Sequence, residues 1–145
     1  MLRLLTLLLP TLWLGVLVGV SGIATPVKFR APSLSLPAAL DVGRVTFRLF
    51  SRVEWVFAIL LLGLYGAVER AVWPLALGGL AAGLVVVQSA WLLPALDRRA
   101  GAVLAGGTAT PSRAHRIYVA AEGCKLLALL ALIAVGLADA GRIAP

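Results

Sequence analysis

The sequence has few of the residues that soluble enzymes and cofactor-binding proteins use. Only 13% of its 145 residues are charged, whereas soluble domains have about 25% charged residues. It contains one cysteine, one histidine and a single methionine, Met1. One cysteine excludes an intrachain disulfide and a cysteine-based metal site, and the single histidine argues against paired axial ligation of a haem. We therefore predict no metal site and no cofactor.

Motifs of known enzyme classes are also missing. The chain has no glycine-rich loop with P-loop spacing, no His-Glu-x-x-His and no G-x-S-x-G elbow. Its Gly106-Gly107-Thr108 stretch stands among Ala, Thr, Pro and Ser, which is typical of a flexible connector. We expect no enzymatic activity and no catalytic residues.

What the sequence does contain is apolar. Hydrophobic residues make up 61% of the chain, and the mean hydropathy is +1.03. A globule of this size leaves about 30% of its unfolded-chain area in water, so a soluble monomer cannot hide so much apolar surface. Disorder requires low hydrophobicity. The composition therefore indicates a protein of the lipid bilayer, and the net charge of +7 does not point to nucleic acid.

A helix that crosses a membrane needs about 20 predominantly apolar residues. The candidate spans are residues 4–24, 53–68, 73–96 and 117–138. Because 53–68 is short, we expect its helix to begin earlier, with Ser35 as N-cap and Pro37 in the first turn. The fold class we predict is all-α: a four-helix transmembrane bundle made of one integral membrane domain, 1–145. A secretory signal peptide is the alternative for 4–24, although signal peptides have a shorter apolar stretch.

The segment 37–52 is amphipathic. Arg44, Arg48 and Arg52 recur every four residues and so form a stripe on one helix face. Such a segment can lie in the headgroup layer before it turns into the membrane, or it can run unbroken into the second span. The sequence leaves both open. In either case the arginine stripe is a candidate contact for lipid headgroups or a partner.

Basic residues predict the orientation of the bundle. Nine of them fall on the side of the two long loops, against three, Arg3, Arg70 and Arg142, on the side of the termini. The nine are Lys28, Arg30, Arg44, Arg48, Arg52, Arg98, Arg99, Arg113 and Arg116. Because excess Lys and Arg mark cytoplasmic loops, we predict periplasmic termini. Heavy use of Arg, Ala, Gly and Leu is typical of GC-rich bacterial genomes, so we expect a bacterial inner-membrane protein.

Several polar side chains lie within or beside the spans. Lys125 lies ~12 Å beyond the start of the last span, at the same depth as Gln88 in the third. An ionisable group facing lipid there costs about 2.5 kcal/mol or more, so it should face the bundle. We predict a cytoplasm-facing polar cluster that binds or conducts a small ligand or a proton. Its members are Glu54, Gln88, Tyr118, Glu122 and Lys125, with His115 at its mouth.

Plainer interpretations stay open. The Glu122 and Lys125 side chains can extend to the headgroups and merely anchor their helix. His115, between Arg113 and Arg116, also fits a solvated residue. The alternative function is that of an accessory or assembly protein, which recruits a partner through its basic cytoplasmic loops.

Two further patterns concern packing. Trp55, Trp73 and Trp91 fall near predicted span ends, where tryptophans anchor helices at the membrane interface. Pairs of glycines at four-residue spacing permit close helix approach, within the chain, in a homo-oligomer or against another membrane protein. These glycines are Gly15, Gly19, Gly79 and Gly83.

Three stretches carry a family resemblance. Residues 19–29 read GVSGIATPVKF, residues 41–50 read DVGRVTFRLF, and residues 91–96 read WLLPAL. They resemble, in order, the glycine and P-x-x-F of the first loop, the glycine-to-Phe segment before helix two, and the aromatic-x-x-Pro stretch of the transmembrane-protein-205-like family. This resemblance implies a small four-span membrane protein with no established reaction. His115 matches the family's histidine at the last helix, whereas the polar residues after it depart from the pattern.

Overall fold

The computed structural model describes residues 2–68, 72–108 and 112–141, and the regular structure in these ranges is entirely helical. Helix α1 (Leu2–Leu17), the π-helical segment η1 (Val18–Ala24) and α2 (Thr25–Lys28) follow one another directly along the chain. The same holds for α4 (Val72–Val87), the π-helical segment η2 (Gln88–Leu92) and α5 (Leu93–Leu104). Together with α3 (Leu36–Val68) and α6 (Arg113–Gly141), they make four long rods.

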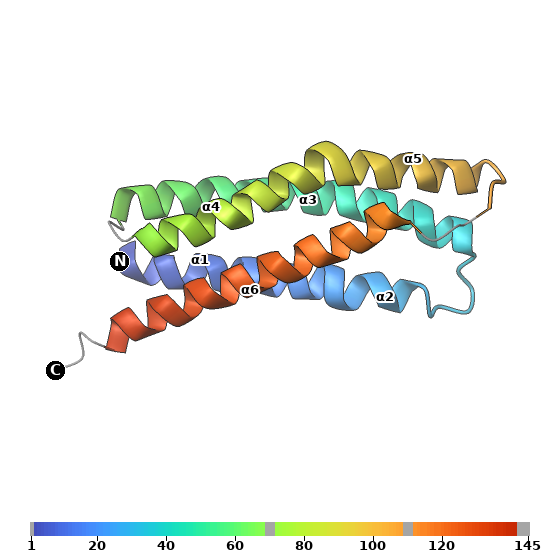
Figure 1. Ribbon diagram of the computed structural model, residues 1–145. Helices are drawn as coiled ribbons and strands as arrows, with labels where there is room; N and C mark the ends of the chain where they lie inside the picture. The colour runs from blue at the N-terminus through green and yellow to red at the C-terminus, as the bar shows by residue number, and fades with distance from the viewer. Residues whose placement is uncertain (1, 69–71, 109–111, 142–145) are drawn as a thin grey trace.

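The four rods run antiparallel and form a closed ring. Helix α1 packs against α3 and α6, and α4 packs against the same two helices from the other side. Helix α1 begins and α6 ends at one end of the bundle, which we call the termini end (Figure 1). Helices α2 and α5 and the start of α3 lie at the opposite end, which we call the loop end (Figure 1).

The prediction of an all-helical fold is confirmed, and three rods are long and apolar enough to cross a membrane: Leu4–Lys28, Val72–Leu104 and Arg113–Asp139. Helix α3 is not among these candidates in the described part of the chain. Its first half carries charged side chains that lower its hydropathy, namely Asp41, Arg44, Arg48, Arg52 and Glu54.

Helix α3 also decides between the two conformations that the sequence left open for 37–52. It is one continuous helix from Leu36 onward, so the arginine stripe runs unbroken into the apolar half. The predicted cap is present at its start, where the hydroxyl of Ser35 accepts a hydrogen bond from the Ala38 N–H at 3.4 Å.

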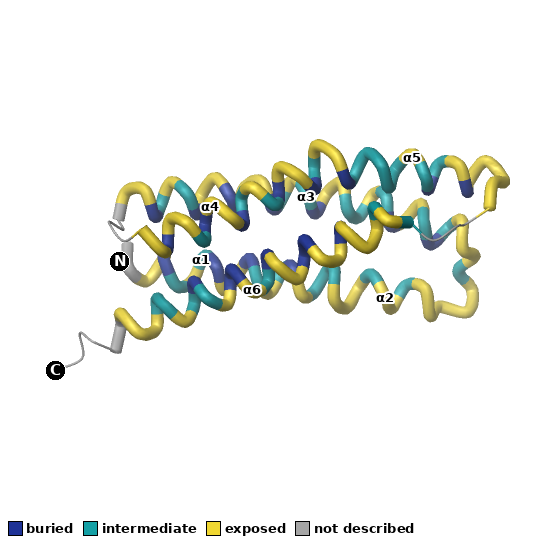
Figure 2. Tube along the Cα trace, viewed as in Figure 1, coloured by how far each residue is buried: buried dark blue, intermediate teal, exposed yellow. Residues whose placement is uncertain are grey.

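The bundle has an apolar outside as well as an apolar core. Trp13, Leu61 and Leu129 are fully buried in the centre. Large apolar side chains such as Ile59 (64% exposed) and Leu127 (65% exposed) cover the outer faces. Figure 2 shows the buried residues as narrow stripes on the inner side of each rod. Such an outer surface suits a lipid environment, where apolar side chains need no burial inside the protein.

Of the alternatives that the sequence left open for the glycine pairs, close packing within the chain is not the one observed. A Cβ atom added at any of the four positions would meet no atom within 4 Å in the described part of the chain; the positions are Gly15, Gly19, Gly79 and Gly83. Other glycines do face a neighbouring helix: Gly78 is packed against Leu61 and Tyr65 of α3, and Gly136 of α6 lies close to Leu7 of α1. A role of the four glycines in contacts with a second chain stays a prediction.

Candidate functional site

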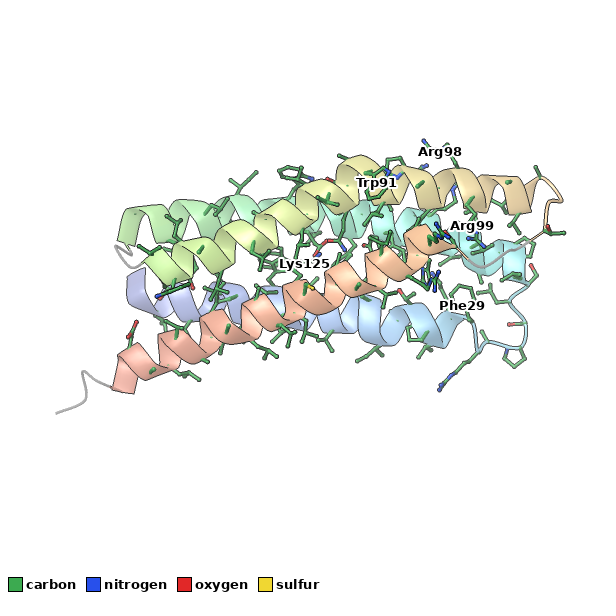
Figure 3. The ribbon with its side chains drawn as sticks, in the orientation of Figure 1. Phe29, Trp91, Arg98, Arg99 and Lys125 are labelled. Carbon is green, nitrogen blue, oxygen red and sulfur yellow. The ribbon has the colours of Figure 1, made fainter. Side chains whose placement is uncertain are left out.

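One buried lysine gathers the polar side chains of the bundle interior. The Lys125 side chain is 0% exposed, and Figure 3 shows it between the rods. Its Nζ donates hydrogen bonds to Gln88 Oε1 at 2.6 Å, to Glu122 Oε1 at 2.9 Å and to Glu54 Oε1. An ammonium has three donors, so all three are used.

Two further hydrogen bonds complete this group, which we call the buried polar cluster. The Trp13 indole N–H donates to Glu54 Oε1 at 3.2 Å, and Gln88 Nε2 donates to Glu122 Oε1 at 2.7 Å. The cluster therefore takes Trp13 from α1, Glu54 from α3, Gln88 from η2, and Glu122 and Lys125 from α6. Every rod of the bundle contributes to it.

Helical periodicity explains why these residues meet. Glu54 stands in the buried stripe of α3 between Phe50 and Ala58, four residues from each. Gln88 extends the buried stripe of α4 three residues beyond Val85, and Lys125 precedes the buried Leu129 by four. Residues three or four apart share a helix face. Each polar residue thus occupies a position where the pattern calls for an apolar one.

The charges within the cluster do not balance. Lys125 supplies one positive charge, and it faces the two carboxyl groups of Glu54 and Glu122. Moreover, Glu122 Oε2 is buried and has no hydrogen-bond partner among the described residues. The cluster thus holds one carboxyl more than its ammonium can neutralise.

The structure separates the six predicted site residues into two groups. Glu54, Gln88, Glu122 and Lys125 are in direct contact, and Lys125 does not extend to the headgroups as the anchoring interpretation required. Tyr118 is buried one turn closer to the loop end, where its ring packs edge-on against Phe47 at 5.4 Å. His115 is exposed and lies nearer still to the loop end.

Trp13 is the member of the cluster that the sequence analysis missed. It lies in the middle of a long apolar run, where an aromatic residue resembles any other apolar one. Its burial is complete, and a buried indole N–H usually finds a hydrogen-bond partner. The need of this N–H group for a partner is the property that could have identified Trp13 as a member of the cluster.

Two cavities lie between the cluster and the loop end. The inner cavity, of about 360 Å³, is lined by Glu122, Tyr118 and His115, and by Ser21, whose buried Oγ has no hydrogen-bond partner in the described residues. The outer cavity, of about 340 Å³, lies nearer the loop end and is lined by residues of α2, α3, α5 and α6. The lining residues that the two cavities share are Thr25, Phe47, Leu96 and His115.

The arginine stripe is partly engaged inside the chain. Arg48 pairs with Asp97 of α5 at 2.6 Å, and Arg44 lies 4.0 Å from the same carboxylate and 3.6 Å from Asp41. Arg52 is exposed. The stripe thus ties α3 to α5, which leaves less of it for a partner than the sequence suggested.

A metal site has no support within the described residues, because no group of three His, Cys, Asp or Glu side chains that could hold an ion occurs there. Cys124 is exposed on α6.

Comparison of the chain with models of protein families, with curated proteins and with solved structures found no match. The resemblance to the transmembrane-protein-205-like family therefore stays a prediction.

Proposed function

We propose that this chain is a four-span protein of a bacterial inner membrane whose buried polar cluster reversibly binds one proton. In this proposal α3 is the remaining span, with its apolar half, 53–68, in the hydrocarbon layer. The observation that carries the proposal is that the carboxyl groups of Glu54 and Glu122 share one fully buried ammonium, that of Lys125.

Electrostatics favours a neutral carboxyl at this place. With all three groups ionised, the cluster of Glu54, Glu122 and Lys125 carries one excess negative charge. An uncompensated buried charge is unfavourable by several kcal/mol, and two carboxylates that share a site do not both ionise readily. One bound proton removes the excess charge and leaves a single ion pair.

Glu122 offers the open position for this proton, which its carboxyl shares with that of Glu54. Its Oε1 already accepts hydrogen bonds from Gln88 and Lys125, whereas its buried Oε2 has no donor among the described residues. A proton on Oε2 leaves both existing hydrogen bonds in place. Because Glu122 lines the inner cavity, this proton has a short route to the outside.

In this conformation, the cluster can exchange its proton with only one end of the bundle. The inner and outer cavities lie between the cluster and the loop end. On the opposite side, the next inward-facing residues are Leu61, Leu129 and Leu132, which are at most 1% exposed. An apolar layer of this kind offers no hydrogen-bonding groups to carry a proton. The cluster therefore exchanges protons with the loop end alone.

The tryptophans support a position for the membrane. Trp73 and Trp91 are 76% and 59% exposed, and they stand eighteen residues apart on one rod. That separation is ~27 Å along a helix, close to the ~30 Å of the hydrocarbon core. With these residues at the two interfaces, Gln88 lies about one helical turn inside the loop-end interface.

The orientation follows from the basic residues, most of which gather toward the loop end. We place that end in the cytoplasm and the termini in the periplasm. Single cysteines introduced at Ser33 and Thr108 should react with an impermeant maleimide from the cytoplasmic side, and labelling from the periplasm would contradict this orientation.

Infrared difference spectroscopy of the protein in lipid vesicles tests the proton. Titration of the wild type should show one protonated-carboxyl C=O band that appears and disappears reversibly with pH. Glu122→Gln should abolish the band. Glu54→Gln should abolish it too, because the remaining carboxylate is then matched by Lys125. Asp139→Asn, which removes an exposed carboxyl from the same helix, should leave it unchanged.

Two results would contradict the proposal. A carboxyl band that persists in both glutamine variants would place the proton elsewhere. A band that is present but does not change with pH, while the protein stays folded, would show a fixed structural proton.

A further inference from the structure

The outer cavity is an apolar space with a positively charged wall. Leu40, Phe47 and Leu96 contribute apolar lining, and Lys28 and Arg99 contribute cations. Figure 3 shows Arg99 turned toward the interior at the loop end, whereas its neighbour Arg98 points away from the bundle. Proton binding at the buried polar cluster does not require cations in the wall of the outer cavity. These cations therefore need a separate explanation.

The positive charge of the wall is largely uncompensated. Asp97 is the acidic residue in the lining, and its carboxylate already pairs with Arg48 at 2.6 Å. Arg44 also lines the cavity; it lies 4.0 Å from the Asp97 carboxylate and 3.6 Å from that of Asp41, and its buried Nε has no hydrogen-bond partner in the described residues. Within the described part of the chain, neither Lys28 nor Arg99 forms an ion pair. An anion in the cavity would supply the missing partner.

Lys28 is held in place without a carboxylate. Its Nζ lies 5.1 Å from the ring centre of Phe29 and 5.6 Å from that of Phe47. It also lies against the backbone of α3 at Gly43, where a Cβ atom would come within 2.6 Å of it. Glycine inside a helix is destabilising by about 0.5–1 kcal/mol relative to alanine. Gly43 thus leaves the room that the ammonium occupies at the cavity wall.

The outer cavity adjoins the inner one. The two share wall residues, and the inner cavity adds Leu17, Val18 and Leu126. Arg99 lies eight residues beyond Trp91, ~12 Å along the helix, which puts the cations at headgroup level when Trp91 marks the interface. The charged space thus lies at the depth of lipid headgroups, and the inner cavity reaches from there to Glu122 and Leu126 beside the buried polar cluster.

We infer that the two cavities together bind one single-chain anionic amphiphile of the fatty-acid class. Its carboxylate occupies the outer cavity beside Lys28, Arg44 and Arg99, and its alkyl chain extends into the inner cavity. Each cavity is near the lower end of the range of ligand pockets, about 300–1,000 Å³. This size suits one chain and a small headgroup, and excludes a two-chain phospholipid. The inference goes beyond proton binding and does not depend on it.

Binding of radiolabelled dodecanoate tests this site. The full chain is placed in phosphatidylcholine nanodiscs, and binding to empty nanodiscs is subtracted. We expect saturable binding of one dodecanoate per chain. Dodecyl phosphate should compete, because it has both charge and chain, whereas dodecanol and inorganic phosphate, which each lack one of them, should not. Competition by inorganic phosphate, or no saturable binding above empty nanodiscs, would overturn the inference.

Variants of neighbouring cations show whether the cavity or the general surface charge binds the anion. Lys28→Gln and Arg99→Gln should each weaken binding about tenfold or more, as expected for loss of a charged hydrogen bond. Gly43→Ala should weaken it too, because the new methyl group displaces the Lys28 ammonium. Arg98→Gln removes the same charge from the outward face and should have no effect. Equal weakening by Arg98→Gln and Arg99→Gln would overturn the assignment to the cavity.

Discussion

Replacement of Lys125 by methionine gives the sharpest test of the buried polar cluster. The ammonium of Lys125 donates to Glu54, Gln88 and Glu122, and it is fully buried. Methionine fills a similar volume but leaves two carboxyl groups without a cation. Removal of one partner from a buried ion pair typically destabilises a protein by about 3–5 kcal/mol. We expect a loss of this size in the free energy of unfolding.

The triple variant Lys125→Met, Glu54→Gln, Glu122→Gln separates charge from packing. It keeps the side-chain volumes close to those of the wild type and removes all three charges, so it should recover most of the lost stability, since neutral replacements for buried ion pairs are often tolerated. Lys28→Met is the matched control, because Lys28 is the other lysine of the chain and has no ion pair among the described residues. It should change stability by less than about 1 kcal/mol.

Reversible unfolding in lipid–detergent mixtures measures these differences. The deficit of Lys125→Met should shrink as the pH falls, because a protonated carboxyl needs no cation. The reasoning would be refuted if Lys125→Met cost no more than Lys28→Met. It would also be refuted if the triple variant were as unstable as Lys125→Met alone.

Three further outcomes follow from individual contacts. Trp13→Phe should destabilise the fold by about 1–3 kcal/mol, because it removes the indole donor to Glu54, whereas Trp73→Phe on the exposed surface should be neutral in the same unfolding assay. Arg48→Gln should cost about 0.2–1 kcal/mol, since its ion pair with Asp97 is partly exposed; a larger loss would mean that this pair fixes α5 on α3. Gly79→Ala should leave the stability of the single chain unchanged or slightly higher, and analytical ultracentrifugation should show whether it disrupts a dimer.

The inward-facing polar residues were predictable from the sequence because two physical rules limit where such side chains can lie. Depth along a helix placed Gln88 and Lys125 at one level, and the cost of a charge in lipid turned Lys125 inward. Helix angle separated Glu54 from the arginine stripe. In the structure, Lys125 donates hydrogen bonds to both Glu54 and Gln88.

Other features depend on information that a hydropathy pattern does not carry. The role of Trp13 depends on one N–H group within an apolar side chain. The π-helical segments change backbone hydrogen bonding without any marked change in composition, and Gln88 opens one of them. The glycine pairs are a pattern that the structure does not use within the chain. Their spacing permits close packing, but it does not say whether a neighbouring helix is present on that face.

The contribution of every rod to the buried polar cluster has a consequence for how the protein is made. Glu54 and Gln88 precede Lys125 by 71 and 37 residues, so both leave the ribosome well before their cation. Until α6 enters the bilayer, a carboxyl group and an amide stand in a low-dielectric interior with unmet hydrogen bonds. A chain whose α6 has not yet joined the other three rods is therefore held back from its final packing. Helix α6 follows the other rods along the chain and brings the group that completes the core, so its arrival commits the earlier helices to their native arrangement.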